Sequence, residues 1–163
     1  MKFFTTVILL SLFFELSAQD TIVGHYRDNF GSRIELNKDG TFKYTWRFDL
    51  VASWTKGTWD LKGDTVYLQM IPIYDTLNQI NSSGILSDTL IFSYNETPER
   101  VTSPIAIAIS LSSGGQNRTN CPDKLLFKKD RLYKIQNDKV ITEKQYADRT
   151  DDKLDPWYFK SGN

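Results

Sequence analysis

Hydrophobic and polar positions alternate with a period of two along much of the first half of the chain. The clearest run is 41–49, whose apolar side chains share one face: Phe42, Tyr44, Trp46 and Phe48. This period predicts a half-buried antiparallel β-strand. Similar alternation continues on both sides of it, and the turn residues at 37–40 and 62–64 predict hairpins between neighbouring strands.

The same pattern returns later in the chain. Further strands are predicted at 90–92, 105–111, 125–127 and 132–135. Residues 72–88 and 112–123 are rich in Ser, Asn, Gly and Pro and predict long loops, whereas Glu143–Arg149 predicts one short helix. The sum is about eight to ten short strands without a long helix, which excludes a βαβ fold. Turn signals roughly every ten residues are typical of an all-β up-and-down barrel or a sandwich.

The first residues predict a secretory signal peptide. Lys2 precedes an apolar run over 3–14, and small residues follow it as far as Ala18. The run is shorter than the roughly 20 residues of a membrane span, and no second apolar span follows. We therefore expect cleavage near Ala18, a mature single domain over 19–163, a periplasmic or secreted location and no stable membrane anchor.

Charge and cysteine content narrow the classes of partner. The 163 residues hold 20 basic and 20 acidic side chains, which argues against nucleic acid or an anionic membrane surface as the main partner. Cys121 is the single cysteine, so no disulfide forms within the chain. Cys121 is either an inert loop residue or a reactive thiol or dimer bridge, and the sequence indicates no oligomeric state.

Residues that could carry catalysis or bind a metal are few. His25 is the single histidine, and no Gly-x-Ser-x-Gly elbow, zinc motif or phosphate-binding glycine loop accompanies it. We therefore expect no metal site, no cofactor and no enzyme that depends on histidine; only carboxylate-based chemistry stays open.

Aromatic residues are the strongest candidates for a binding site. They gather in the first half of the mature chain, and the candidates for lining a cavity are Tyr44, Trp46, Trp59 and Tyr67. Such residues can line a pocket for a small apolar or ring-bearing ligand. They can equally fill the interior of a small barrel, and the sequence leaves both alternatives open.

A short motif, Asp-Thr followed by an aliphatic residue, occurs four times. Its threonines are Thr21, Thr65, Thr76 and Thr89. In the structural interpretation, Asp ends a turn and Thr opens a strand. In the functional interpretation, the motif resembles the O-glycosylation acceptor of a group of bacteria that modify exported proteins.

Several short motifs together resemble one family. Val23-Gly24-His25-Tyr26, the strand and turn over 34–44, Gly57-Thr58-Trp59-Asp60-Leu61 and the Gly-Asp-Thr turn at 63–65 look like the small lipocalin-like domains of exported bacterial proteins. The resemblance covers residues 22–71 and implies a calycin-type barrel.

These observations favour an exported, non-enzymatic module that binds a small apolar or aromatic ligand. The alternative is an inhibitor or immunity-type factor of the cell envelope that contacts a protein partner through the loops 72–88 and 112–123. An apolar void inside the barrel would favour the ligand, whereas a filled interior with exposed aromatic side chains would favour the protein partner.

Overall fold

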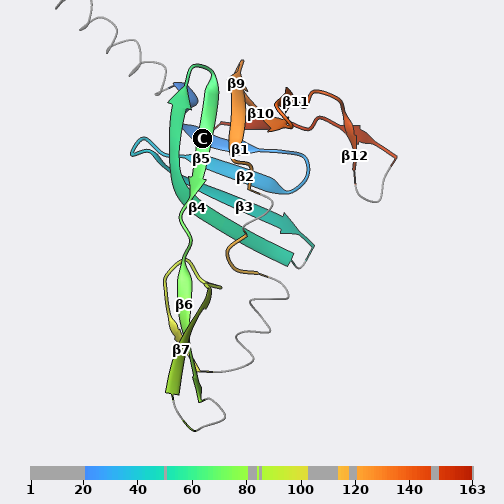
Figure 1. The fold of residues 1–163 in the computed structure, drawn as a ribbon. Helices are drawn as coiled ribbons and strands as arrows, with labels where there is room; N and C mark the ends of the chain where they lie inside the picture. Colours follow the sequence, from blue (N-terminus) through green and yellow to red (C-terminus); the bar gives the residue numbers. More distant parts are fainter. Residues whose placement is uncertain are drawn as a thin grey trace, which may run out of the picture.

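The structure is a computed structural model that describes residues 21–49, 51–80, 84, 86–102, 114–117, 121–147 and 151–162. Within these residues the fold is almost entirely β (Figure 1). Eight strands form the main body: β1 (Gly24–Arg27), β2 (Ser32–Leu36), β3 (Thr41–Phe48), β4 (Val51–Lys62), β5 (Thr65–Met70), β9 (Lys124–Lys128), β10 (Arg131–Gln136) and β14 (Tyr158–Ser161).

These eight strands close into an antiparallel barrel. Their order is β10-β14-β1-β2-β3-β4-β5-β9, and β9 also pairs with β10 to complete the ring. The last strand, β14, lies between β1 and β10, so that Tyr26 faces Lys160 and Leu132 faces Tyr158. The predicted all-β, up-and-down barrel is confirmed, and its architecture is consistent with a calycin-like fold.

Tight turns connect the barrel strands where the sequence predicts them. Gly40 and Gly63 have φ angles of 78° and 61°, which glycine adopts without a steric penalty. The β9–β10 turn instead places Lys129 and Asp130 at φ angles of 52° and 55°. Two consecutive positive φ angles are typical of the type I′ turn that matches the twist of a hairpin.

The barrel interior is filled by its own side chains. Alternate residues of each strand point inward, and the fully buried ones include Tyr26, Ile34, Leu36, Phe42, Tyr44, Val66, Leu125, Leu132 and Tyr158. Packing is tight enough that a Cβ added at Gly57 would lie 2.8 Å from the Phe42 ring. The Tyr26 hydroxyl donates a 2.6 Å hydrogen bond to the Ile22 carbonyl, so this buried polar group is satisfied.

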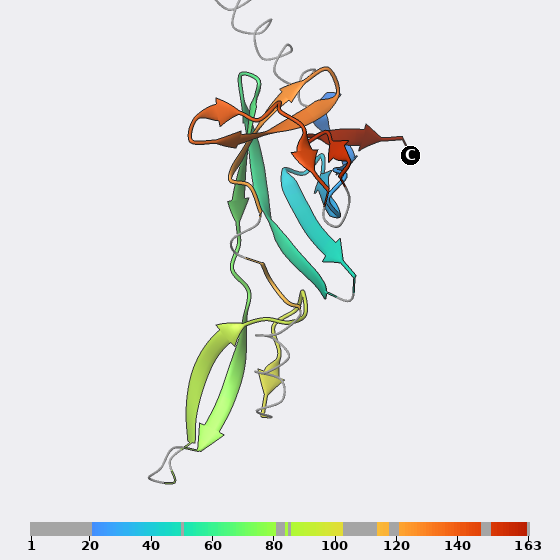
Figure 2. The ribbon, with the colours of Figure 1, turned by 90° about the vertical axis from the view of Figure 1, so that its right-hand side faces the viewer.

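An arm projects from the barrel between β5 and β9. It contains β6 (Tyr74–Ile80), β7 (Leu86–Phe92) and β8 (Arg100–Val101), in the order β7-β6-β8 (Figures 1 and 2). The prediction of a loop over 72–88 is therefore wrong for its described residues. Polar side chains such as Asn78 and Asp88, which suggested a loop, hydrogen-bond each other across the two strands.

The C-terminal region differs from the sequence prediction in a second way. The described residues 143–147 of the predicted helix are not helical; β12 (Gln145–Tyr146) instead pairs with β13 (Lys153–Leu154). The Lys153 ammonium lies 4.8 Å from the centre of the Tyr146 ring, which supports this small sheet. A further short strand, β11 (Lys139–Val140), extends the β10 hairpin.

Three predictions fall outside the described residues. They are the signal peptide over 1–18, the strand over 105–111 and part of the loop over 112–123. Among the described residues, no helix has both the length and the hydropathy needed to cross a bilayer.

The assignment of side chains to the inner or the outer face of the barrel leads to a prediction about stability. Phe42→Ala removes a ring that is 2% exposed, and it should lower the free energy of unfolding by about 3–5 kcal/mol. Tyr67→Ala removes a ring that is 43% exposed on the outside of β5, and it should cost at most about 1 kcal/mol. Urea denaturation of both variants measures the difference; equal losses would contradict the assigned faces.

Candidate functional site

The four aromatic residues predicted to line a cavity do not meet in one place. Tyr44 and Trp59 are core residues, and the Trp59 indole N–H donates a 2.9 Å hydrogen bond to the Asn37 carbonyl. Trp46 is half-buried near one end of the barrel. Tyr67 is 43% exposed and lies on the outer surface, because its neighbours on β5 point inward.

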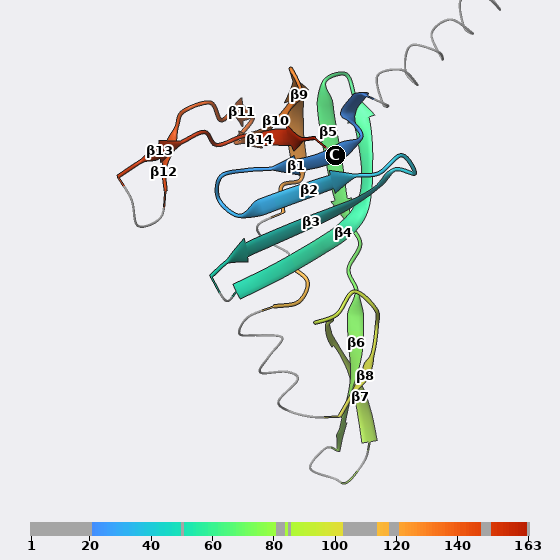
Figure 3. The same cartoon turned by 180° about the vertical axis from the view of Figure 1, so that it is seen from behind.

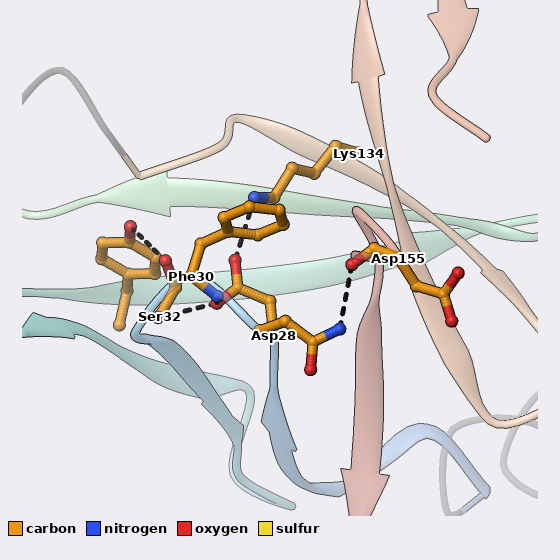
Figure 4. A network of polar contacts seen from close by, with 7 residues as sticks. Asp28, Phe30, Ser32, Lys134 and Asp155 are labelled. Atoms are coloured by element: carbon orange, nitrogen blue, oxygen red, sulfur yellow. Dashed lines mark hydrogen bonds and ion pairs between the residues drawn. The ribbon is translucent and has the colours of Figure 1, made fainter. Parts of the chain in front are cut away.

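A buried polar cluster occupies the end of the barrel near Trp46 (Figure 4). Asp28 follows β1, and one carboxylate oxygen accepts hydrogen bonds from the backbone N–H groups of Phe30 at 2.9 Å and Ser32 at 2.8 Å. The other oxygen accepts a 2.9 Å bond from the Lys134 ammonium on β10. The Asp28 side chain is 0% exposed and that of Lys134 is 30% exposed, so water screens this ion pair weakly.

The surroundings of this ion pair indicate a structural role. The Lys134 ammonium also lies 5.6 Å from the Phe30 ring centre and 5.1 Å from that of Tyr158. Ser32 continues the network through a 3.2 Å hydrogen bond with the Tyr44 hydroxyl. Because Asp28 is paired and multiply hydrogen-bonded, the cluster fixes the β1–β2 turn to β10 rather than presenting a free carboxylate.

A groove lies on the outside, where the base of the arm (residues 94–96 after β7) meets the barrel wall at Thr45 and Trp54. Its volume is about 870 Å³, and Trp46, Trp54 and Tyr94 are among its lining residues. The Trp54 indole N–H donates a 2.9 Å hydrogen bond to the Tyr94 carbonyl, which fixes the plane of the indole. Glu96 pairs with Lys43 of β3 at 2.5 Å, so the loop after β7 is held against the sheet.

Two buried polar side chains set the geometry of that loop. Asp75 is 5% exposed and accepts hydrogen bonds from the Ser93 hydroxyl and the Glu99 backbone N–H, both at 2.8 Å. Gln116 accepts a 2.8 Å bond from the backbone N–H of Ile73 and donates a 2.7 Å bond to the Ile71 carbonyl. The arm base is therefore a defined wall of the groove, and sequence reasoning noticed Asp75 only as part of the Asp-Thr motif.

His25 lies on the outer wall, and within the described ranges its contacts do not form a catalytic pair. Its neighbours across the sheet are Glu35 on β2 and Ser161 on β14. The imidazole Nδ1 is 3.9 Å from the Glu35 carboxylate, and the Ser161 hydroxyl donates to the backbone carbonyl of His25 at 3.0 Å. A serine nucleophile would instead donate to the imidazole, so these contacts do not form a hydrolytic triad.

The remaining candidate positions are distributed over the molecule. No group of three or more His, Cys, Asp or Glu side chains in the described ranges is arranged to hold a metal ion. Thr21 and Thr89 are exposed, whereas Thr65 and Thr76 are half-buried within strands. Thr65 opens β5 directly after a turn, as the structural interpretation of the motif expects; O-glycosylation stays a prediction.

Comparisons of the chain with protein-family models, with curated proteins and with solved structures find no match in any of the three. The choice among functions therefore depends on the geometry of the described residues.

The buried ion pair leads to a second stability prediction. Asp28→Ala leaves the Lys134 ammonium and two backbone N–H groups without their partner, and it should cost about 3 kcal/mol of unfolding free energy. Asp60→Ala is the matched control, because Asp60 on β4 pairs with Lys62 at 3.8 Å but is 65% exposed. This control should leave the urea midpoint almost unchanged. Equal midpoints for the two variants would contradict the structural role of Asp28.

Cys121 leads to a prediction about reactivity. The residue packs against the core cluster, and burial, followed by the charge of Asp123, raises the pKa of its thiol to about 12. The thiol is therefore protonated at neutral pH, and the thiolate is the reactive form. A disulfide reagent at pH 8 should modify the folded protein on the order of 100-fold more slowly than the urea-unfolded protein. Similar rates would show that the thiol is accessible and activated.

Proposed function

We propose that this chain is an exported, non-enzymatic binding module that takes a ring-bearing ligand on the outside of its barrel. One observation carries the proposal: side chains occupy the interior, whereas the groove of about 870 Å³ lies between the barrel wall and the arm base. The ligand site is thus expected at Trp54 and Tyr94, with Trp46 at the rim on the opposite face of the sheet, and not among the interior tyrosines.

The aromatic walls of the groove suit this function because their orientation is set before a ligand arrives. Trp54, on the outer face of β4, is held through its indole N–H. On the opposite face, at the rim of the barrel, the Trp46 ring stacks against Phe48 with a centroid separation of 6.2 Å. A ring that is already ordered loses little conformational entropy on binding. Large aromatic faces beside polar groups are also typical of sites that recognise rings carrying polar substituents.

The proposed export and family assignment have separate support. The basic and apolar start of the chain and its small-residue exit indicate a leader that ends near Ala18. The motifs over 22–71 form β1 to β5 of a closed barrel, as a lipocalin-like domain requires. A module of this kind outside the cytoplasm would meet its ligand in the periplasm or in the medium.

A protein partner is the second candidate, and the arm favours it. Leu90 of β7 and Tyr74 of β6 are 65% and 39% exposed, although both are large hydrophobic residues. Such side chains on a projecting sheet are typical of contact surfaces between proteins. In this alternative the arm would bind a partner of the cell envelope, and the groove would carry no ligand.

Indole N–H signals in a ¹H–¹⁵N NMR spectrum distinguish the possible binding places. Trp54 reports on the outer groove, whereas Trp59, bonded to the Asn37 carbonyl, reports on the interior. Titration with methyl glucoside, 4-nitrophenol and indole as small ring-bearing probes should shift the Trp54 signal at millimolar concentrations and leave Trp59 in place. Trp54→Phe assigns the signal and serves as the matched control.

Two results would contradict the proposal. A shift of Trp59 without Trp54 would place the ligand inside the barrel. No shift of either signal, together with capture of an envelope protein that Leu90→Asp abolishes, would favour the arm as the functional surface.

A further inference from the structure

A row of cationic and aromatic side chains crosses the outer wall of the barrel. Cross-strand pairing places six residues in one line: Arg131 of β10, Phe159 of β14, Arg27 of β1, Arg33 of β2, Thr45 of β3 and Trp54 of β4. Figure 3 shows β14, β1, β2, β3 and β4 following one another in this order. Five spacings of about 4.8 Å give the row a length of roughly 24 Å, measured around the curved wall of the barrel.

The centre of the row concentrates positive charge. Arg27 and Arg33 are exposed and face each other directly on neighbouring strands. Like charges at facing positions destabilise a sheet. Among the described residues, no carboxylate lies within 4.0 Å of either guanidinium. The barrel therefore keeps two adjacent guanidinium groups that have no anionic partner within that part of the chain.

The carboxylates close to Arg27 and Arg33 already contact other residues. Asp28 pairs with Lys134 inside the barrel end, and Glu96 pairs with Lys43. Glu35 faces the imidazole of His25 at 3.9 Å. Because Asp28 and Glu96 are each matched by a lysine, they do not neutralise the two arginines, and among the residues that the structure describes Glu35 is the single carboxylate that lines the groove of about 500 Å³ together with both of them.

Aromatic rings flank the charged centre on both sides. On one side the Arg131 guanidinium lies 5.3 Å from the ring centre of Trp157 and 5.6 Å from that of Phe159. On the other side Trp54 is fixed by its bond to the Tyr94 carbonyl. An extended ligand that crosses the row would therefore meet a ring, two guanidinium groups and a second ring.

The surface along this row is hollowed. Three grooves of about 870, 720 and 500 Å³ meet here, and Arg27 lines all of them. Arg33, Lys43 and Thr45 line two of the three. Ser161 and Asn29 also line these grooves, and their hydroxyl and amide groups can form hydrogen bonds with a ligand that carries many hydroxyl groups.

We propose that this row binds an acidic polysaccharide, a chain of sugar rings that carry carboxylate or sulfate groups. The anionic groups would bind the guanidinium groups of Arg27 and Arg33 in bidentate fashion. The apolar faces of sugar rings would lie on Trp54 and Phe159. This inference rests on the proposed function and names the chemical class of its ligand.

A single-stranded nucleic acid has related chemistry but fits the molecule less well. Aromatic rings and a basic groove also bind single strands. However, the chain has 20 basic and 20 acidic residues, and its start predicts export. A site with few cations on a protein of zero net charge suits a polysaccharide that carries isolated acidic groups.

Affinity measurements with defined polymers test the proposal. Polygalacturonate is the acidic probe, dextran the neutral probe and an oligo-dT strand the nucleic acid probe. The mature protein should bind polygalacturonate, more weakly as salt rises, and bind dextran and oligo-dT less tightly. Arg27→Gln/Arg33→Gln should weaken polygalacturonate binding about tenfold or more. Because it removes a repulsive pair, it should unfold at the same temperature as the parent protein or higher.

A matched control separates a specific site from general attraction. Lys62→Gln/Lys139→Gln removes the same charge from exposed positions on β4 and β11, outside the row, and should leave the affinity unchanged. An equal loss in both double variants would overturn the proposal, as would tighter binding of oligo-dT. If the small ring-bearing probes shift the Trp54 signal but polygalacturonate does not bind, the proposed function stands and this inference is wrong.

Discussion

The limited space inside an eight-stranded barrel is the constraint on which the rest of this structure depends. A ring of this size leaves room for side chains and little else. Here Tyr26, Tyr44 and Tyr158 occupy that room, and burial raises the pKa of each phenol. Each buried hydroxyl then needs a partner, and the Ile22 carbonyl and the Ser32 hydroxyl serve Tyr26 and Tyr44. The aromatic content of the chain is thus largely used for folding.

A filled interior moves recognition to the outer surface. The end of the barrel is occupied by the Asp28–Lys134 pair, whose partners all belong to the protein. The arm base then adds a second wall outside the sheet, held by Asp75 and Gln116. The groove between these walls and the arginine row beside it therefore depend on a rigid barrel, which positions side chains from distant parts of the chain.

Local patterns predicted the barrel strands well because each follows from neighbouring residues. The alternation around Phe42 and the turn at Gly40 suffice for the β2–β3 hairpin. In the arm, the alternation of Leu90 and Phe92 predicts the end of β7, whereas β6 carries polar side chains that composition alone assigns to a loop. Tyr67 was placed in the cavity because it is aromatic, although the alternation of β5 points it outward.

The Asp28–Lys134 pair joins positions 106 residues apart, and no local signal connects them. The same holds for Arg27 and Arg131, which only the closure of the barrel through β14 brings into one row.

Xenon binding tests the central claim, that side chains fill the barrel, most directly. Xenon enters dry apolar cavities in proteins and is easily located in a crystal structure or from NMR shifts under gas pressure. A filled barrel predicts no xenon between Tyr26, Tyr44 and Tyr158 and no change in the signals of these residues. A xenon atom bound among the three rings would reveal an apolar cavity and would return the ligand site to the barrel interior.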